Sequence, residues 1–300
     1  MTHHHHHINT SHSGKILFTI FLNIGITVAQ VIGGLLSGSL ALLSDALHNF
    51  TDVISLIISY IASIFSSKDA SAQRTFGYKR AEILAAFVNA ATLVVIAIIL
   101  IKEAIERFFN PQTIESDLVI ILSFVAILGN GFSVLLLKSQ SQRNMNMKSA
   151  YLHLLTDMLA SVAVLVGGLL MKFYEIFWID SLLTLAIALY LIYVSVDLLF
   201  KSYRVLMLFT PDYINIENIV TKVNMINGVS LLHHVHVWQL NDDEIHLEAH
   251  LDFEADLKIS QFDDILIEIE NLVKTDFGIN HVTIQPEYNK PDSKDIIVQD

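Results

Sequence analysis

Two short segments of the sequence each place a histidine four residues before an aspartate within an apolar stretch. They are His48 with Asp52 and His153 with Asp157, and both read His-x-x-x-Asp. On an α-helix, positions i and i+4 lie one turn apart on the same face, so each pair would project from its helix in one direction. Two such helices facing each other would bring two imidazoles and two carboxylates together. That donor set fits a tetrahedral Zn²⁺ ion.

The apolar surroundings make these four side chains costly unless they have partners. An ionised carboxylate in the middle of a bilayer costs at least about 2.5–3.5 kcal/mol. A bound dication would be a suitable partner, and protons would replace it when no metal is present. Since histidine and aspartate bind metal only when deprotonated, metal affinity would then depend on pH, as a metal/proton exchanger requires. Interhelical hydrogen bonds are the alternative role, but two identical pairs favour the metal site.

Asp45 lies on the same helical face as His48, three residues before it. Two interpretations are open for this carboxylate. It could be a waiting site for ions, or a negative charge near the N-terminus of a helix that follows the Gly38–Ser39 turn. We favour the second. Gln30 is expected to join helices by hydrogen bonding, and Asp180 is given no chemical role.

The elements that must carry these residues are membrane spans. The chain has 300 residues, of which 53% are hydrophobic and only 16% charged, too apolar a composition for a single soluble core. Runs of about 20 apolar residues can cross a bilayer. Six such runs occur, near residues 15–38, 40–65, 82–104, 117–138, 150–171 and 177–199. We therefore predict an α-helical membrane protein with a bundle of six transmembrane helices at 15–205.

The distribution of charge predicts how the spans are oriented. Ten Lys and Arg residues fall at the N-terminus, in the second and fourth loops and after the sixth span, against three on the other side. Positive loops remain in the cytoplasm, so both termini are expected there. Residues 211–300 hold 18 Asp and Glu but only 5 Lys and Arg. Such an acidic region argues against a nucleic acid partner.

Residues 210–289 have the pattern of a small α+β domain. The expected order is a helix at 214–225, strands at 231–240 and 244–253 joined by an Asn-Asp-Asp turn, a helix at 260–275 and a strand at 280–286. One face of this sheet would be rich in histidine and carboxylate. Regulatory metal binding and an ordinary solvated face are both compatible with that pattern.

The two ends of the chain are expected to lie outside these domains. Residues 1–14 form a His-rich tail with five consecutive histidines, compatible with an expression tag or a natural metal-binding tract. Residues 290–300 are predicted to be a flexible tail. The chain has no cysteine, so any metal must be held by His, Asp or Glu.

Three segments resemble signatures of the cation diffusion facilitator family, in particular its bacterial zinc-exporting branch. They are SGSLALLSDALHNFTD, FGYKRAEILAAFVNA and SAYLHLLTDMLASVAVL. The resemblance implies a transport site at His48, Asp52, His153 and Asp157, and histidine at position 48 resembles the zinc-selective members. It further implies a homodimer, a cytoplasmic ferredoxin-like domain and Zn²⁺/H⁺ antiport by alternating access. The loop between the fourth and fifth spans lacks the long His-rich insert of many eukaryotic vesicle transporters in the family, which favours a bacterial-type exporter in the plasma (inner) membrane. The family's cytoplasmic metal positions correspond to His233, His250 and Glu287, the last replacing an aspartate.

The sequence thus predicts a non-enzymatic transporter that exports divalent cations, Zn²⁺ first, across the lipid bilayer in exchange for protons. A passive divalent-cation channel and a membrane metal sensor are the alternatives. A membrane metallohydrolase fits less well, because no His-Glu-x-x-His motif or other positioned general base accompanies the ligands.

Overall fold

The computed structural model describes residues 10–66, 68–141 and 145–298. Within these ranges, some side chains of α1, α2, α4 and α5 lie outside the description, that of Asp52 among them. The chain divides into two compact units, one made of residues 1–58 and 88–197 and the other of residues 59–87 and 198–300.

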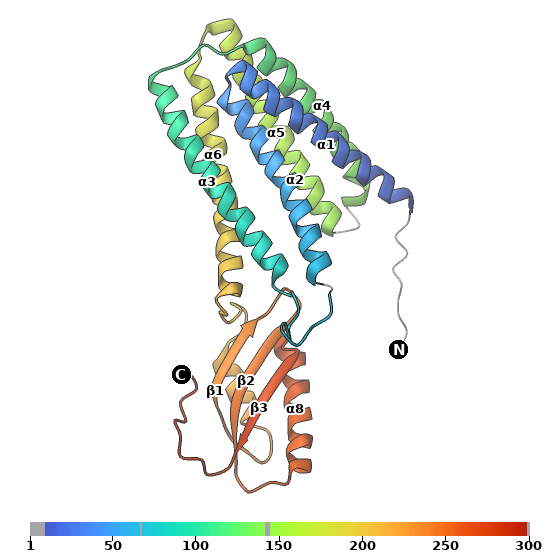
Figure 1. Cartoon of the computed structure of the whole chain (residues 1–300), viewed down its shortest axis with the longest axis vertical. Helices are drawn as coiled ribbons and strands as arrows, with labels where there is room; N and C mark the ends of the chain where they lie inside the picture. Colours follow the sequence, from blue (N-terminus) through green and yellow to red (C-terminus); the bar gives the residue numbers. More distant parts are fainter. Residues whose placement is uncertain (1–9, 67, 142–144, 299–300) are drawn as a thin grey trace. The chain divides into compact units, whose positions relative to one another are not determined.

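Six long helices form the first two thirds of the chain (Figure 1). They are α1 (Thr10–Ser37), α2 (Leu40–Ser66), α3 (Ala81–Phe109), α4 (Ser116–Ser141), α5 (Met145–Tyr174) and α6 (Trp178–Leu206). Among the described residues, α3, α4, α5 and α6 contain stretches long and apolar enough to span a membrane, and α1 adds a shorter apolar stretch, Phe21–Ser37. The predicted six-helix bundle is confirmed.

A carboxylate from α6 fixes the start of α2. Asp180 accepts hydrogen bonds from the backbone N–H groups of Leu40 (2.8 Å) and Ala41 (3.3 Å) and from the Ser39 hydroxyl (2.5 Å). The first N–H groups of a helix have no partner within that helix, and a negative charge there is favourable. Asp180 therefore caps α2 from a distant part of the sequence.

The turn between α1 and α2 is compact enough to hold the two helices close together. Gly38 adopts a φ of 75°, a left-handed conformation that suits glycine. Its carbonyl accepts a 2.6 Å hydrogen bond from Arg107 of α3. A Cβ on Gly34 would lie 3.1 Å from the Leu43 backbone, so a larger residue there would push the helices apart. The position of α2, which carries His48, is thus set by α1, α3 and α6.

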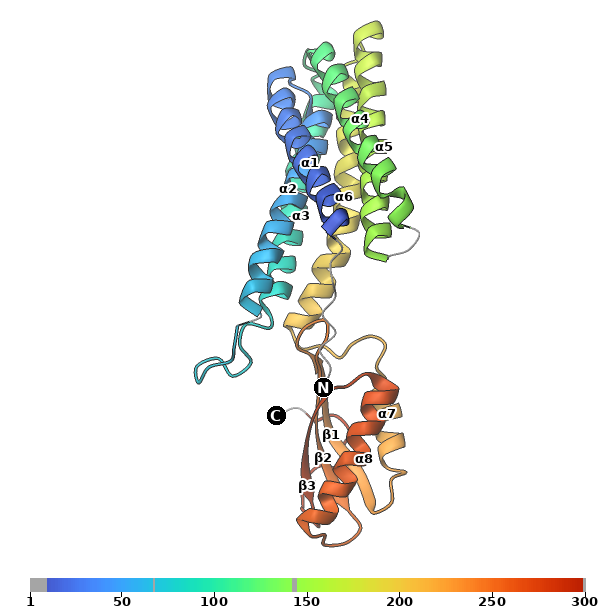
Figure 2. The same cartoon turned by 90° about the vertical axis from the view of Figure 1, so that its right-hand side faces the viewer.

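The C-terminal region is a small α+β domain with its own core. Its elements are α7 (Ile216–Val223), β1 (Val229–Gln239), β2 (Ile245–Phe253), α8 (Ile259–Phe277) and β3 (His281–Glu287). β1 and β2 are antiparallel, β2 and β3 are parallel, and β2 lies in the centre of the sheet. Figure 2 shows α7 and α8 on one side of the sheet. This order matches the predicted ferredoxin-like arrangement.

The inward side chains of the strands alternate with polar ones and pack beneath the helices. Leu247, Ala249 and Leu251 of β2 are buried with Ile269 and Val273 of α8. The intervening residues of β2 therefore face the opposite side of the sheet, which no helix described in this domain covers. This second side is called the open face below.

The segment after β3 reaches back to β1, an edge strand of the sheet. Its backbone carbonyls at Asp295 and Ile296 accept hydrogen bonds from the N–H groups of His234 (3.1 Å) and Val235 (2.8 Å) in β1. Ile296 also packs against the domain core. Residues 290–300 were predicted to form a flexible tail, yet this part of the segment is paired with a strand, because a bulge in β1 leaves backbone donors for it.

Replacing Asp180 by Ala should lower the stability of the helical unit by about 1–3 kcal/mol, because three buried donors lose a charged acceptor. Thermal unfolding of the full chain in detergent would measure this change. Asp117→Ala is the matched control: its carboxylate, paired with Lys172, is exposed. The control should lose less than about 1 kcal/mol. Equal melting temperatures for the Asp180 variant and the wild-type protein would contradict the proposed capping role.

Candidate functional site

The predicted transmembrane site forms between α2 and α5. His48 lies on α2, and His153 and Asp157 lie on α5. His48 Nε2 is 3.8 Å from Asp157 Oδ1, and His153 Nε2 is 3.5 Å from Asp157 Oδ2. The two imidazole rings are 5.9 Å apart at an angle of 72°. One ligand atom from each of the three residues lies within 4.8 Å of the others, so the structure brings these predicted residues together.

Burial is uneven within this group of three side chains. Asp157 is only 2% exposed, and His48 is half-buried. The side chain of His153 is 44% exposed. The carboxylate is thus the most enclosed donor and depends most on a neighbouring proton or cation. Zinc needs ligands at about 2.0–2.2 Å, so modest side-chain movements would be required to close the donors around an ion.

The fourth predicted residue, Asp52, is one helical turn beyond His48 on α2. Its side chain lies outside the described residues. Its position on the same face of α2 follows from the four-residue spacing alone. The role of Asp52 as a ligand therefore remains a prediction.

Asp45 lies beside this group but has partners of its own. It is 1% exposed and accepts hydrogen bonds from Gln30 of α1 (2.7 Å) and from Ser161 of α5 (3.2 Å). The preferred interpretation of Asp45 as a charge at the α2 N-terminus is wrong, since Asp180 fills that role. Asp45 instead joins three helices, and Gln30 provides the interhelical hydrogen bond expected of it.

A cavity of about 260 Å³ adjoins the transmembrane group. Its lining includes Asp45, His48 and Asp157, together with Tyr190 of α6. A space of this size can hold several water molecules, since one water occupies about 30 Å³ of liquid. The titratable side chains are therefore beside a space through which water or an ion could reach them.

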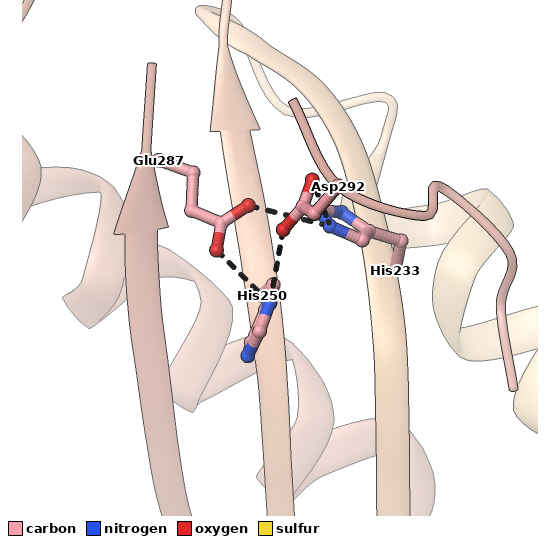
Figure 3. A group of neighbouring side chains, drawn as sticks. All are labelled: His233, His250, Glu287 and Asp292. Atoms are coloured by element: carbon pink, nitrogen blue, oxygen red, sulfur yellow. Dashed lines mark ion pairs between the residues drawn. The ribbon is translucent and has the colours of Figure 1, made fainter. Parts of the chain in front are cut away.

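A second group of donors lies on the open face of the C-terminal sheet. It consists of His233 of β1, His250 of β2, Glu287 at the end of β3 and Asp292 in the following segment (Figure 3). One ligand atom from each lies within 4.8 Å of the others. His250 Nδ1 is 3.0 Å from Glu287 Oε1, and His233 Nε2 is 3.4 Å from Glu287 Oε2. We call these four residues the cytoplasmic cluster.

Strand pairing explains how three of these residues meet. His233 and His250 are directly opposite each other in the antiparallel pair. In the parallel pair, Glu287 is opposite Asp252, two residues beyond His250 on the same face of β2, so Glu287 lies near His250. The bulge after His233 leaves the rings of His233 and His234 both near His250, with centroids 5.5 and 4.5 Å away. The three residues predicted from the sequence are thus brought together. Asp292 was not predicted as a ligand, because the segment that carries it was expected to be a flexible tail.

Two lysines influence the charge of the cytoplasmic cluster. Burial alone would raise the pKa of Glu287, but hydrogen bonds from Lys290, Gln285 and Lys294 outweigh it and hold that pKa below the usual value. A hydrogen bond from Lys294 likewise lowers the pKa of Asp292. Burial lowers the pKa of His250. Both carboxylates are therefore ionised and His250 is neutral near pH 7, the forms that bind metal.

Three aromatic side chains lie side by side elsewhere on the open face. The indole of Trp238 stacks on the imidazole of His246, with centroids 5.2 Å apart at 15°. His281 lies on the other side of His246, with its ring 4.4 Å away. Burial and the neighbouring His281 both lower the pKa of His246. This row belongs to neither group of candidate ligands.

The chain is similar to known protein families and proteins over most of its length. The family model described as "Cation efflux transmembrane domain" matches residues 16–207, and "Cation efflux protein, cytoplasmic domain" matches residues 211–289. A "Cadmium, cobalt and zinc/H(+)-K(+) antiporter" of Bacillus subtilis (strain 168) is 35% identical over 94% of this chain and 91% of that protein. "Zinc transporter ZitB" of Escherichia coli (strain K12) is 32% identical over 96% and 93%. "Metal cation efflux system protein CzcD" of Cupriavidus metallidurans is 34% identical over 87% and 82%.

The stacked pair gives an optical test of the electrostatics of the open face. Protonation of His246 should quench the fluorescence of Trp238, with a midpoint below pH 6.5 because burial disfavours the charged ring. A pH titration of the full chain would measure this midpoint. The transition should disappear in His246→Phe and persist in His153→Gln, which changes a histidine of the helical unit. A midpoint at or above pH 6.5 would contradict the assignment.

Proposed function

The chain belongs to the cation efflux family of membrane transporters, and on that premise we propose that it exports divalent cations from the cytoplasm in exchange for protons. The main support for the proposal is that His48, His153 and Asp157, from two helices of the bundle, lie close enough together to bind one ion. Because this family consists of transporters, a membrane metallohydrolase is no longer an alternative function. The proposed substrate is Zn²⁺, because two imidazoles with carboxylate oxygens form a typical zinc donor set.

Exchange follows from the chemistry of these donors. Each imidazole nitrogen or carboxylate oxygen can bind a proton or a metal ion, but not both at the same atom. A metal entering from the cytoplasm would displace protons from His48, Asp52, His153 and Asp157. After the site opens to the other side, returning protons would displace the metal. The inward proton gradient would then drive export.

Burial makes the empty, ionised site unfavourable. Asp157 is enclosed between helices, where an unpaired charge costs several kcal/mol. The site would therefore change conformation only when metal or protons are bound, and not when it is empty and ionised. That requirement couples the two fluxes, provided the two open states bind these ligands unequally. A passive channel has no such requirement.

The cytoplasmic cluster is proposed to bind regulatory metal of the same kind. Two imidazoles and two carboxylates lie within reach of one ion, and the donor set fits Zn²⁺. The matched cytoplasmic domain further supports a homodimer. The proposed location is the plasma membrane, as expected for a bacterial-type member of this family. The distribution of Lys and Arg favours both termini in the cytoplasm.

Zinc uptake into proteoliposomes under an imposed pH gradient tests the transport site. Asp157→Asn should reduce gradient-driven zinc flux at least about 100-fold, since the amide keeps the shape but neither releases a proton nor carries the charge. Asp117→Asn, an exposed carboxylate of the same helical unit, should transport normally. Equal flux in the Asp157 variant and the wild-type protein would refute the assignment. Flux that ignores the pH gradient would favour the channel.

The preference for zinc can be tested at position 48. Replacing His48 by Asp exchanges an imidazole for a carboxylate, which suits a wider range of cations. We expect the ratio of zinc to cadmium transport to fall in His48→Asp, by about 10-fold, a difference of about 1.4 kcal/mol. Competition between the two metals in the same vesicles would measure it. An unchanged ratio would show that His48 does not set the preference.

A further inference from the structure

A lysine ammonium lies among the donor atoms of the cytoplasmic cluster. Lys294 Nζ is 2.5 Å from Asp292 Oδ1, 3.3 Å from Glu287 Oε2 and 3.4 Å from His233 Nε2. Three of the four proposed ligands thus already contact a cation that belongs to the chain itself. Lys290 contacts the other oxygens, at 2.6 Å from Glu287 Oε1 and 3.4 Å from Asp292 Oδ2.

The segment that supplies this lysine also supplies a ligand. Asp292 and Lys294 both lie beyond residue 289, where the match to the cytoplasmic family domain ends. Pairing of Asp295 and Ile296 with β1 holds the segment beside the cluster. Asp292 thereby reaches His233 and His250, at 3.9 and 3.8 Å. The same short segment adds one carboxylate and one competing cation to a group whose other members lie on the strands.

Metal and ammonium cannot share these donors. A zinc ion needs its ligands at about 2.0–2.2 Å, and His233 Nε2, Glu287 Oε2 and Asp292 Oδ1 would have to turn toward it. Lys294 Nζ lies between those same atoms, and it repels a second positive charge. The ammonium must therefore withdraw before a dication is bound.

Lys294 has a separate partner to which it can withdraw. Its Nζ is 2.8 Å from Asp252 Oδ2, and Asp252 is not one of the four clustered donors. The Asp252 side chain is 13% exposed, at the edge of the group. The lysine could therefore keep one ion pair while releasing the other three donors, and the pairing of the segment with β1 need not be broken.

We propose that the segment after β3 sets the affinity of the cytoplasmic metal site, with Asp292 as its fourth ligand and Lys294 as a built-in cation that the metal must displace. The inference rests on the proposed cytoplasmic metal site. The occupant is a divalent cation of zinc-like chemistry. Competition by Lys294 weakens binding, so that the site fills only when the cytoplasmic metal concentration rises.

Two substitutions in this segment should have opposite effects. Lys294→Gln should tighten zinc binding at the cytoplasmic site, and Asp292→Asn should weaken it, each by about 10- to 100-fold, the range found for groups that act on metal ligands. A merely structural role for the segment would weaken binding in both variants. Lys274→Gln, which removes an exposed charge from α8, is the matched control and should stay within about twofold.

The measurement is a zinc titration of the full chain in detergent, by calorimetry. The binding event lost in His233→Gln identifies the cytoplasmic site, because the transmembrane group and the N-terminal histidines are present in all variants. An unchanged or weaker site in Lys294→Gln would overturn the role of the lysine, and unchanged binding in Asp292→Asn would overturn that of the carboxylate. The whole inference would be overturned if neither the wild-type protein nor Lys294→Gln showed a binding event that His233→Gln removes. Gradient-driven zinc flux in the same preparations tests the transport proposal independently.

Discussion

A carboxylate enclosed between membrane helices has to be neutralised, and much of the helical unit is organised around that constraint. Asp157 is almost completely buried, and its neighbours are two imidazoles that can also exchange protons. Charge in such surroundings is tolerated only with a partner. A proton and a metal ion are the two partners that this chemistry allows. In the proposed function, coupling between them would therefore arise from the cost of leaving the group ionised and unoccupied.

This function requires α2 and α5 to hold their donors in register, and buried polar contacts provide the framework. Asp180 caps α2 from α6, and Arg107 of α3 bonds the preceding turn. Asp45 joins α1, α2 and α5 one turn from His48. Such contacts have discrete geometries, so a change in one helix is passed to its neighbours as a rearrangement of partners. The same framework that fixes the donors could thus carry the movement of alternating access.

Local patterns in the sequence predict the parts of the structure that depend on short spacings. Apolar runs give the six helices, alternation gives the strands, and the i, i+4 spacing places His153 and Asp157 on one face. Roles that depend on distant parts of the chain could not be found in this way. Asp180 meets α2 across about 140 residues, and nothing near Asp180 in the sequence marks it as a cap. Asp292 and Lys294 reach the cytoplasmic cluster only because their segment pairs with a bulge in β1.

Under the proposals made above, both groups of donors would follow one rule, in which a cation site lacking its metal is occupied by another positive charge. Protons would fill that role in the membrane, and Lys294 would fill it in the cytoplasmic domain. The most direct test of the rule is the number of protons released when zinc binds the full chain in weakly buffered solution. The account predicts net proton release that falls in Asp157→Asn. Zinc binding at the transmembrane group with no proton release, or with equal release in the variant, would contradict it.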